Sequence, residues 1–333
     1  MEAFIEMFRS LDYTVYTYFE KRYGKPSSNK SVVDLFSLQK IDISIIYTPS
    51  LFNFVVIVYL RILRRSNVYF YFHEPFDTIR SYKDSGFSMS RICMMFCIDF
   101  TNKLCCLASS FILLGSDRSL EVYMRKYLVY NRNFQKLPLI YPDKDISKNI
   151  IQKKKYISYI GTVASDHAFD NFFNFLISAV KDSKLRNFSF LIATSSTLPT
   201  SKIKTLKKYD VYNQVKLVHG TYMDDDFINN CYAESMMVWN AYLRGMQSGV
   251  LARSFMFATP VLVYRKNINE YVRDKVNSYF ITDLNDIDQF KHAIMFCFEN
   301  IAFLTTNARD TFDSTFNYNN YLSIFNNERN ISD

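Results

Sequence analysis

Glycine is scarce in this chain, with seven residues in 333. Glycine serves where the backbone needs a positive φ or where a ligand approaches the main chain closely. Two of the seven, Gly245 and Gly249, stand four positions apart between an apolar run and a helix-like segment. In a chain this poor in glycine, that spacing predicts a stretch of backbone that contacts a ligand.

The cysteines lack any pattern typical of metal binding. The chain has no pair of CxxC motifs and no histidine at zinc-ligand spacing from a cysteine, and we expect no bound metal. Each cysteine lies in an apolar run, which predicts reduced thiols in the core at Cys93, Cys97, Cys105, Cys106, Cys231 and Cys297.

No apolar run is long enough to cross a membrane. The longest, residues 51–60, is about half of what a bilayer span requires, and Arg61, Arg64 and Arg65 follow it. Two interpretations stay open: a buried helix with a solvated basic end, or a helix lying on an anionic membrane, which the net charge of +8 would suit. The start of the chain lacks a secretory signal, so we expect a cytoplasmic protein, with the inner face of the cytoplasmic membrane as the alternative.

Clustered basic stripes typical of nucleic-acid binding are also missing. The lysines form short local groups with no recognisable binding module around them, at residues 153–155 and at Lys202, Lys204, Lys207 and Lys208. We therefore expect no nucleic-acid partner.

What the sequence does contain is a regular alternation of apolar strands and helices. Strands are predicted at residues 43–47, 68–72, 111–114, 156–160, 188–194, 215–219, 235–239, 261–264 and 278–281. Helices are predicted between them at residues 52–63, 90–107, 118–127, 169–181, 201–208, 224–233, 248–257 and 286–298, followed by a polar helical tail. Strands that are apolar on both faces favour parallel sheets covered by helices.

The length and a lysine-rich stretch at residues 143–155 predict two lobes of roughly 150 residues each. The predicted fold class is α/β, with two tandem doubly wound Rossmann-like lobes, residues 1–150 and 151–333, facing a cleft. The first lobe opens with a helix at residues 2–11 and a strand near 13–19, so we expect it to lack the usual opening strand.

Residues 239–263 predict a phosphate-binding junction in the second lobe. They comprise a buried strand, a polar loop with Gly245, a helix that begins near Ser248, and a second buried strand. Such a helix start directs backbone N–H groups and the positive end of the helix dipole at an anion. An ordinary strand-to-helix turn is the alternative.

The same segment resembles the donor-binding motif of glycosyltransferases of the B fold, most closely family 4. Gly245 and Arg253 occupy the positions where most members carry glutamates, but the chain fits a variant of the motif. The residues that match this variant are Tyr242, Gln247, Ser248, Gly249, Val250, Leu251 and Pro260. The resemblance implies that residues 247–250 and the Ser248 hydroxyl hold the donor diphosphate, with Arg253 at the ribose position or, alternatively, facing solvent.

Residues 159–167 resemble the first strand and turn of the family's donor-binding lobe. After Gly161 the chain carries Thr162 and His167 where many members place basic residues against the diphosphate. The resemblance implies a phosphate contact for His167, and an exposed loop histidine is the alternative. Arg244 and Lys266 are the other candidates for the missing positive charge.

Residues 69–75 form the third similarity, a strand that runs into His73, Glu74 and Pro75. Family members place a histidine followed by an acid near the transferred sugar or its acceptor, which implies a catalytic role for His73 and Glu74. A histidine bonded to nearby backbone is the alternative. The turn at residues 115–119 is a weaker similarity, and helix capping by Ser116 or Asp117 is the alternative. Gly220 is expected near the nucleotide base, and the acids at residues 224–226 are expected to open a helix and complement its dipole.

The resemblance implies a metal-independent hexosyltransferase that needs no cofactor. Its substrates would be a nucleoside diphosphate sugar and a glycan or polyprenyl-diphosphate-linked acceptor in surface polysaccharide, capsule or O-antigen synthesis, with retention of anomeric configuration. Two alternatives stay open: a nucleotide-sugar epimerase of the same fold, and a non-catalytic partner subunit of a glycosyltransferase, which the missing glutamates would permit.

Overall fold

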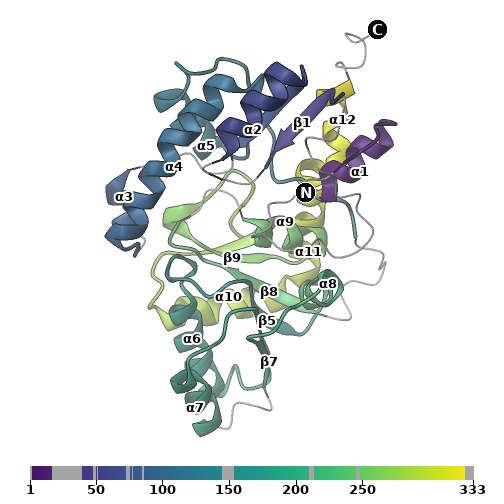
Figure 1. Cartoon of the computed structure of the whole chain (residues 1–333). Coiled ribbons are helices and arrows are strands. Elements are labelled where there is room, and N and C mark those ends of the chain that lie inside the picture. The colour runs from purple at the N-terminus through teal and green to yellow at the C-terminus, as the bar shows by residue number, and fades with distance from the viewer. Residues whose placement is uncertain are drawn as a thin grey trace. The chain divides into compact units, whose positions relative to one another are not determined.

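The structure is a computed structural model that describes residues 2–16, 40–47, 50, 52–72, 76, 78–84, 86–144, 154–209, 214–244 and 248–326. The chain forms two compact units, each with its own sheet (Figure 1). The first unit comprises Met1–Asp77, Ser90–Pro142 and Tyr318–Asp333, and the second comprises Thr78–Met89 and Asp143–Asn317.

The first unit is built on a parallel sheet of four strands in the order β1-β2-β3-β4. The strands are β1 Ile43–Ile46, β2 Asn67–Phe72, β3 Phe111–Leu114 and β4 Phe134–Lys136. The helices are α1 Glu2–Ser10, α2 Asn53–Val58, the π-helix η2 Tyr59–Leu63, α4 Met89–Ala108, α5 Asp117–Lys126, the 3-10 helix η8 Tyr318–Tyr321 and α12 Leu322–Asn326.

Alternate residues of β2 enter two different cores. Phe70 and Phe72 pack with side chains of α2, α4 and α5 on one face of the sheet, whereas Tyr69 and Tyr71 pack with α1 and α12 on the other. The chain thus returns to the first unit with α12, which packs near α1 (Figure 1). The ring of Phe325 lies 5.0 Å from that of Phe8. Burial on both faces explains why β2 is apolar after its first residue.

The second unit contains a parallel sheet of six strands in the order β10-β9-β8-β5-β6-β7. The strands are β5 Tyr156–Ile160, β6 Ser189–Thr194, β7 Val215–His219, β8 Ser235–Asn240, β9 Val261–Tyr264 and β10 Ser278–Ile281. The helices are α3 Ile79–Asp84, η4 Ser165–His167, α6 Phe169–Lys181, α7 Thr200–Lys208, α8 Asp225–Ala233, α9 Gly249–Met256, η6 Arg265–Asn267, α10 Ile287–Glu299, α11 Ile301–Thr311 and η7 Phe312–Phe316.

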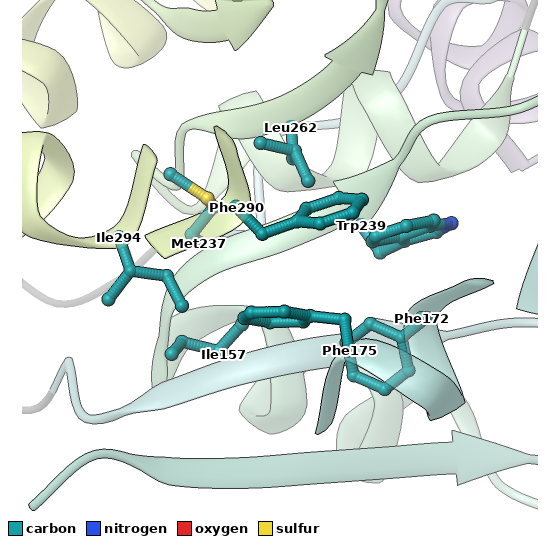
Figure 2. Close-up of a pocket in the computed structure, with 8 residues that line it drawn as sticks. All are labelled: Ile157, Phe172, Phe175, Met237, Trp239, Leu262, Phe290 and Ile294. Atoms are coloured by element: carbon teal, nitrogen blue, oxygen red, sulfur yellow. The ribbon is translucent and has the colours of Figure 1, made fainter. Parts of the chain in front are cut away.

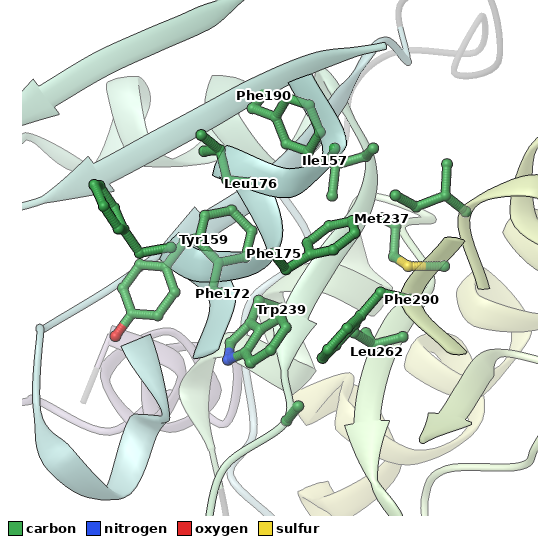
Figure 3. Packing of buried hydrophobic residues seen from close by; sticks show 14 of the residues in the cluster. Ile157, Tyr159, Phe172, Phe175, Leu176, Phe190, Met237, Trp239, Leu262 and Phe290 are labelled. Atoms are coloured by element: carbon green, nitrogen blue, oxygen red, sulfur yellow. The ribbon is translucent and has the colours of Figure 1, made fainter. Parts of the chain in front are cut away.

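Aromatic side chains fill the core of this second unit (Figure 3). The Trp239 ring stacks on Phe290 of α10 at 5.2 Å and meets Phe172 of α6 edge-on at 5.4 Å. A small cavity nearby is lined only by apolar side chains of this core (Figure 2). It has no polar group to orient a substrate, so it belongs to the packing and is not a ligand site.

Most predicted elements are confirmed, and several match residue for residue, including the strands at 111–114, 156–160, 215–219, 261–264 and 278–281 and the helix at 169–181. The strand predicted at residues 13–19 is wrong over residues 13–16, while 17–19 lie outside the described residues. Asp12 takes a φ of 61°, which ends α1, and Tyr13 folds back so that its amide donates to the carbonyl of Phe8. The chain therefore turns back against the end of α1 at residues 12–13 and does not continue as an extended strand.

The prediction of six core thiols is wrong for two of them. Cys105, Cys106, Cys231 and Cys297 are buried, whereas Cys93 and Cys97 on α4 are exposed, and none of the six forms a disulfide. Among the described residues, no helix is both long and apolar enough to span a bilayer.

Candidate functional site

The strand order of the second unit defines one place where a ligand is expected. The chain winds from β5 outward to β6 and β7, then returns to the other side of β5 with β8, β9 and β10. In open parallel sheets of this kind, ligands bind outside the carboxyl ends of the strands where the order reverses, here β5 and β8. The described segments that follow these two strands, residues 161–168, 241–244 and 248–250, therefore form the candidate site.

The turn after β5 passes close to the start of α9. Gly161 has a φ of 133°, and a Cβ added there would lie 3.7 Å from Cγ2 of Val250. Only glycine takes this conformation readily. The Gly161 turn and the first turn of α9, far apart in sequence, thus meet at the same edge of the sheet.

His167 is fixed between these two segments. Its Nδ1 lies 2.7 Å from the carbonyl oxygen of Thr162, and its ring stacks on Tyr242 with centroids 4.3 Å apart. The indole of Trp239 also donates to the carbonyl of His167. Because a carbonyl only accepts, Nδ1 carries a proton, and Nε2 is the nitrogen left to accept from a ligand or, when protonated, to donate to one.

Helix α9 begins near Ser248 as predicted, and Ser248 is its N-cap. Its Oγ accepts from the amide of Val250 at 3.2 Å, and its side chain also hydrogen-bonds the hydroxyl of Tyr242. Burial raises the pKa of Tyr242, whereas the hydrogen bond from Ser248 lowers it. Burial has the larger effect, so the phenol stays neutral. Tyr242 therefore ties the helix start to His167, and no acidic residue lies in the first turn of α9 to oppose an anion.

Arg244 is the basic side chain on the segment after β8. Its guanidinium donates to the hydroxyl of Tyr82 at 2.9 Å and lies over the Tyr82 ring at 3.9 Å, with Phe87 alongside. Tyr82 is fully buried. Cation–π and hydrogen-bond contacts together hold the charge of Arg244 at the carboxyl end of β8.

Tyr82 belongs to residues 78–89, a segment that precedes β3 in the chain yet packs on the second unit. Gly86 of this segment reaches the β5 turn, since a Cβ added there would lie 3.5 Å from Cβ of Ser165. The segment thus touches both loops of the candidate site. Lys266, the other basic candidate, lies with Nζ 5.8 Å from the ring of Tyr264.

Two buried acceptor oxygens at the site have no hydrogen-bond partner within the described part of the chain. They are Oδ1 of Asn240, the last residue of β8, and Oδ1 of Asp166, beside His167. Buried polar atoms are nearly always paired, and hydroxyl groups of a ligand would satisfy such oxygens. Neither residue was predicted, although Asn240 is the first polar residue after the apolar run of β8.

Three other predicted residues take structural contacts. Arg253 forms an ion pair with Asp225 at 2.6 Å, and Leu251 is fully buried in the core. Gly220 has a φ of 68°, and its amide donates to the carbonyl of Ser196, whose hydroxyl accepts from Val163 in the β5 turn. Gly220 therefore supports the site through Ser196.

His73, Glu74, Gly245 and Gln247 lie outside the described residues, so their predicted roles stay predictions. Asp225 and Asp226 lie in the first turn of α8, as expected, and Asp224 caps this helix by accepting from the amide of Phe227. Within the described ranges, no three His, Cys, Asp or Glu side chains gather in a way that would hold a metal ion.

Comparison with known proteins agrees with this geometry. Residues 154–300 match the family described as Glycosyl transferases group 1, a stretch that contains both loops of the candidate site. No curated protein matches the sequence.

Solved structures share the fold at low sequence identity. HepE of Anabaena in complex with UDP-glucose superposes with a TM-score of 0.62 at 12% identity, over 86% of this chain and 78% of that one. Sucrose-phosphate synthase of Thermosynechococcus elongatus gives 0.61 at 12% identity, over 86% and 73%. WaaG, a glycosyltransferase involved in lipopolysaccharide biosynthesis, gives 0.59 at 15% identity, over 82% and 80%.

Residues 154–300 therefore match the group 1 glycosyl transferases, and the chain has the α/β fold with two parallel sheets of the B-fold glycosyltransferases.

Proposed function

We propose that the protein is a glycosyltransferase that moves a sugar from a nucleoside diphosphate sugar onto a lipid-linked or growing polysaccharide acceptor. The observation that carries the proposal is the convergence at β5 and β8 of the α9 helix start, His167 and Arg244. These are the groups that a diphosphate needs: backbone N–H donors, a ring nitrogen and a fixed cation. The match of residues 154–300 supports the same assignment.

Similar structures support the donor class. HepE is described in complex with UDP-glucose, and the pneumococcal O-GlcNAc transferase GtfA in complex with UDP and GlcNAc. We propose a nucleoside diphosphate sugar as the donor here as well. The unpartnered oxygens of Asn240 and Asp166 would then accept hydroxyl groups of that donor.

The chemistry that we propose stabilises the charge of the departing diphosphate. As the glycosidic bond to the donor breaks, negative charge grows on the leaving phosphate oxygen, where the α9 start and Arg244 would stabilise it. This role needs no metal ion and no cofactor. By resemblance we propose retention of anomeric configuration, with His73 and Glu74 acting near the transferred sugar and its acceptor.

The acceptor side of the proposal concerns the first unit. We propose that it binds a glycan or polyprenyl-diphosphate-linked acceptor in surface polysaccharide synthesis, of the capsule or O-antigen type, at the inner face of the cytoplasmic membrane. WaaG, whose fold is similar, is involved in lipopolysaccharide biosynthesis.

The direct test is calorimetric titration of the protein with nucleoside diphosphates and their sugars, followed by NMR of the anomeric proton of any product. Donor binding and transfer support the proposal. Donor binding without transfer to any acceptor of a polysaccharide panel would instead support a partner subunit, and absence of nucleotide binding would overturn the donor site.

Replacing Ser248 with alanine is expected to weaken nucleoside diphosphate binding by about tenfold, because α9 loses its cap and Tyr242 loses its anchor. Asp286→Ala is the matched control, since Asp286 caps α10 of the same unit in the same way. Both variants should lose stability, but only Ser248→Ala should lose affinity. Equal dissociation constants for the two would contradict a ligand at the α9 start.

Replacing Tyr82 with phenylalanine is expected to raise the dissociation constant for a nucleoside diphosphate about fivefold. The change removes the hydrogen bond to Arg244 and keeps the ring beneath its guanidinium, so the charge becomes less well positioned. Tyr123→Phe is the control: it removes a comparable hydrogen bond, to the carbonyl of Asn131 in the first unit. If both variants bind nucleotide like the parent, Tyr82 is structural only.

A further inference from the structure

Helix α4 of the first unit is turned with its polar residues inward. Asp99 and Asn102 are 5% and 6% exposed, whereas Phe96 and Phe100 are 58% and 63% exposed. A helix on the surface of a water-soluble unit normally has the opposite arrangement. The Asp99 carboxylate is paired inside the unit with Tyr127 and Lys103, so the orientation of α4 is fixed by buried contacts.

The exposed apolar residues of α4 form one continuous stripe. With about 100° of rotation per residue, they fall within an arc of about 160°, on the side away from the buried residues of the helix. The α4 stripe consists of Met89, Cys93, Met94, Phe96, Cys97, Phe100 and Leu107.

A second exposed apolar group lies next to the end of α4. Arg61 of η2 donates to the carbonyls of Ala108 and Ser109, which brings η2 against the C-terminal end of α4. The same helical stretch exposes Phe52, Val55, Ile62 and Leu63, each by more than 60% of its surface. Figure 1 shows α2 and α4 in the same part of the first unit. We call these four residues and the α4 stripe together the apolar face.

The exposed charged side chains of these two helical stretches are all positive. Residues 53–65 contain Arg61, Arg64 and Arg65 and no acid, and in α4 the only acid is the buried Asp99. Arg65 is exposed directly after η2, and Arg91 is exposed three positions before Met94, at one border of the α4 stripe. Exposed apolar side chains bordered by cations suit an anionic lipid surface, where the side chains enter the interface and the cations meet phosphate groups.

We propose that the apolar face docks on an anionic lipid bilayer, with the α4 stripe and the exposed side of η2 inserted at headgroup depth and the arginines contacting lipid phosphates. Membrane docking deepens the proposed function, because a lipid-linked acceptor reaches the enzyme at such a surface. Only this delivery of the acceptor rests on the proposed function. The buried polar residues of α4 and its exposed apolar stripe are the observations behind this proposal.

The test is co-sedimentation of the full chain with vesicles, in the absence of donor and acceptor. Equimolar phosphatidylcholine and phosphatidylglycerol vesicles should bind the protein, and high salt should weaken the binding. The double variant Phe100→Ser with Leu107→Ser should lower the partition coefficient roughly tenfold or more. Phe298→Ser with Phe303→Ser, at exposed apolar positions of the second unit, is the matched control and should bind like the parent.

A variant that lacks two arginines separates the contribution of positive charge to vesicle binding from that of the apolar side chains. Arg65→Gln with Arg91→Gln should lower partitioning into anionic vesicles roughly tenfold and leave the weak binding to pure phosphatidylcholine unchanged. Parent-like vesicle binding by the Phe100/Leu107 variant would overturn the proposal. If that variant binds vesicles like the parent but has lost a self-association that the parent shows, the apolar face is an interface between two copies of the chain instead. Because the assay needs no nucleotide, a failed donor titration beside intact vesicle binding would overturn the proposed function alone.

Discussion

Replacing Arg244 with methionine is expected to lower kcat/KM for sugar transfer by about 100-fold, the size of effect seen when one fixed group that stabilises transition-state charge is removed. Arg244 follows β8, one of the two strands at which the sheet order reverses, and Tyr82 holds its guanidinium by a hydrogen bond and by its ring. A cation fixed in advance needs no reorganisation when charge develops on the leaving diphosphate. Methionine keeps much of the side-chain length and removes the charge.

Two further variants make this prediction specific. Arg244→Lys keeps the charge but loses the planar guanidinium, so an intermediate loss of about tenfold is expected. Arg186→Met removes an arginine just before β6, at the opposite end of the sheet, and should leave kcat/KM unchanged. Activity is measured as transfer or slow donor hydrolysis, with calorimetry for nucleotide affinity. Parent-like kcat/KM in Arg244→Met would remove Arg244 from the proposed chemistry.

The strands that the sequence predicted best include both central and edge strands of the second unit. β5 and β9 are apolar runs that are mostly buried, and their limits match. The limits of the edge strands β7 and β10 match as well, although these strands are only partly buried. β4 has only three residues and shows no apolar run, so periodicity could not reveal it. The strand predicted after α1 failed because the αL conformation of Asp12 turns the chain back.

The candidate site was predictable where it depends on local sequence. Ser248 at the start of α9 and the turn after Gly161 follow from glycine placement and capping. The partner of Arg244 was not predictable, since Tyr82 lies 162 positions away and comes from a segment that packs on the other unit. The outward apolar side of α4 was also hidden, because Asp99 and Asn102 would be expected to face solvent in a surface helix and are buried instead.

Lys154→Met is expected to destabilise the second unit by about 3 kcal/mol, because it leaves several inward-facing oxygens without their donor. The Lys154 ammonium lies 2.9 Å from the carbonyl of Phe257, 3.2 Å from that of Ser235 and 2.7 Å from Oγ1 of Thr259. Ala233 and Phe257 end α8 and α9, so one cation meets the negative ends of two helix dipoles. Methionine has a similar length but donates no hydrogen bond.

The neighbouring lysine provides the control for this effect. Lys155 is exposed, with its ammonium over the ring of Tyr156, and Lys155→Met should unfold like the parent. The only tryptophan of the chain, Trp239, lies in the core of the second unit, so its fluorescence during urea unfolding reports on that unit. Lys154 contacts the amino ends of the strands, at the edge opposite the candidate site. At low urea, where Lys154→Met is still folded, its nucleotide affinity should therefore equal that of the parent, and a lowered affinity there would show that Lys154 also shapes the site.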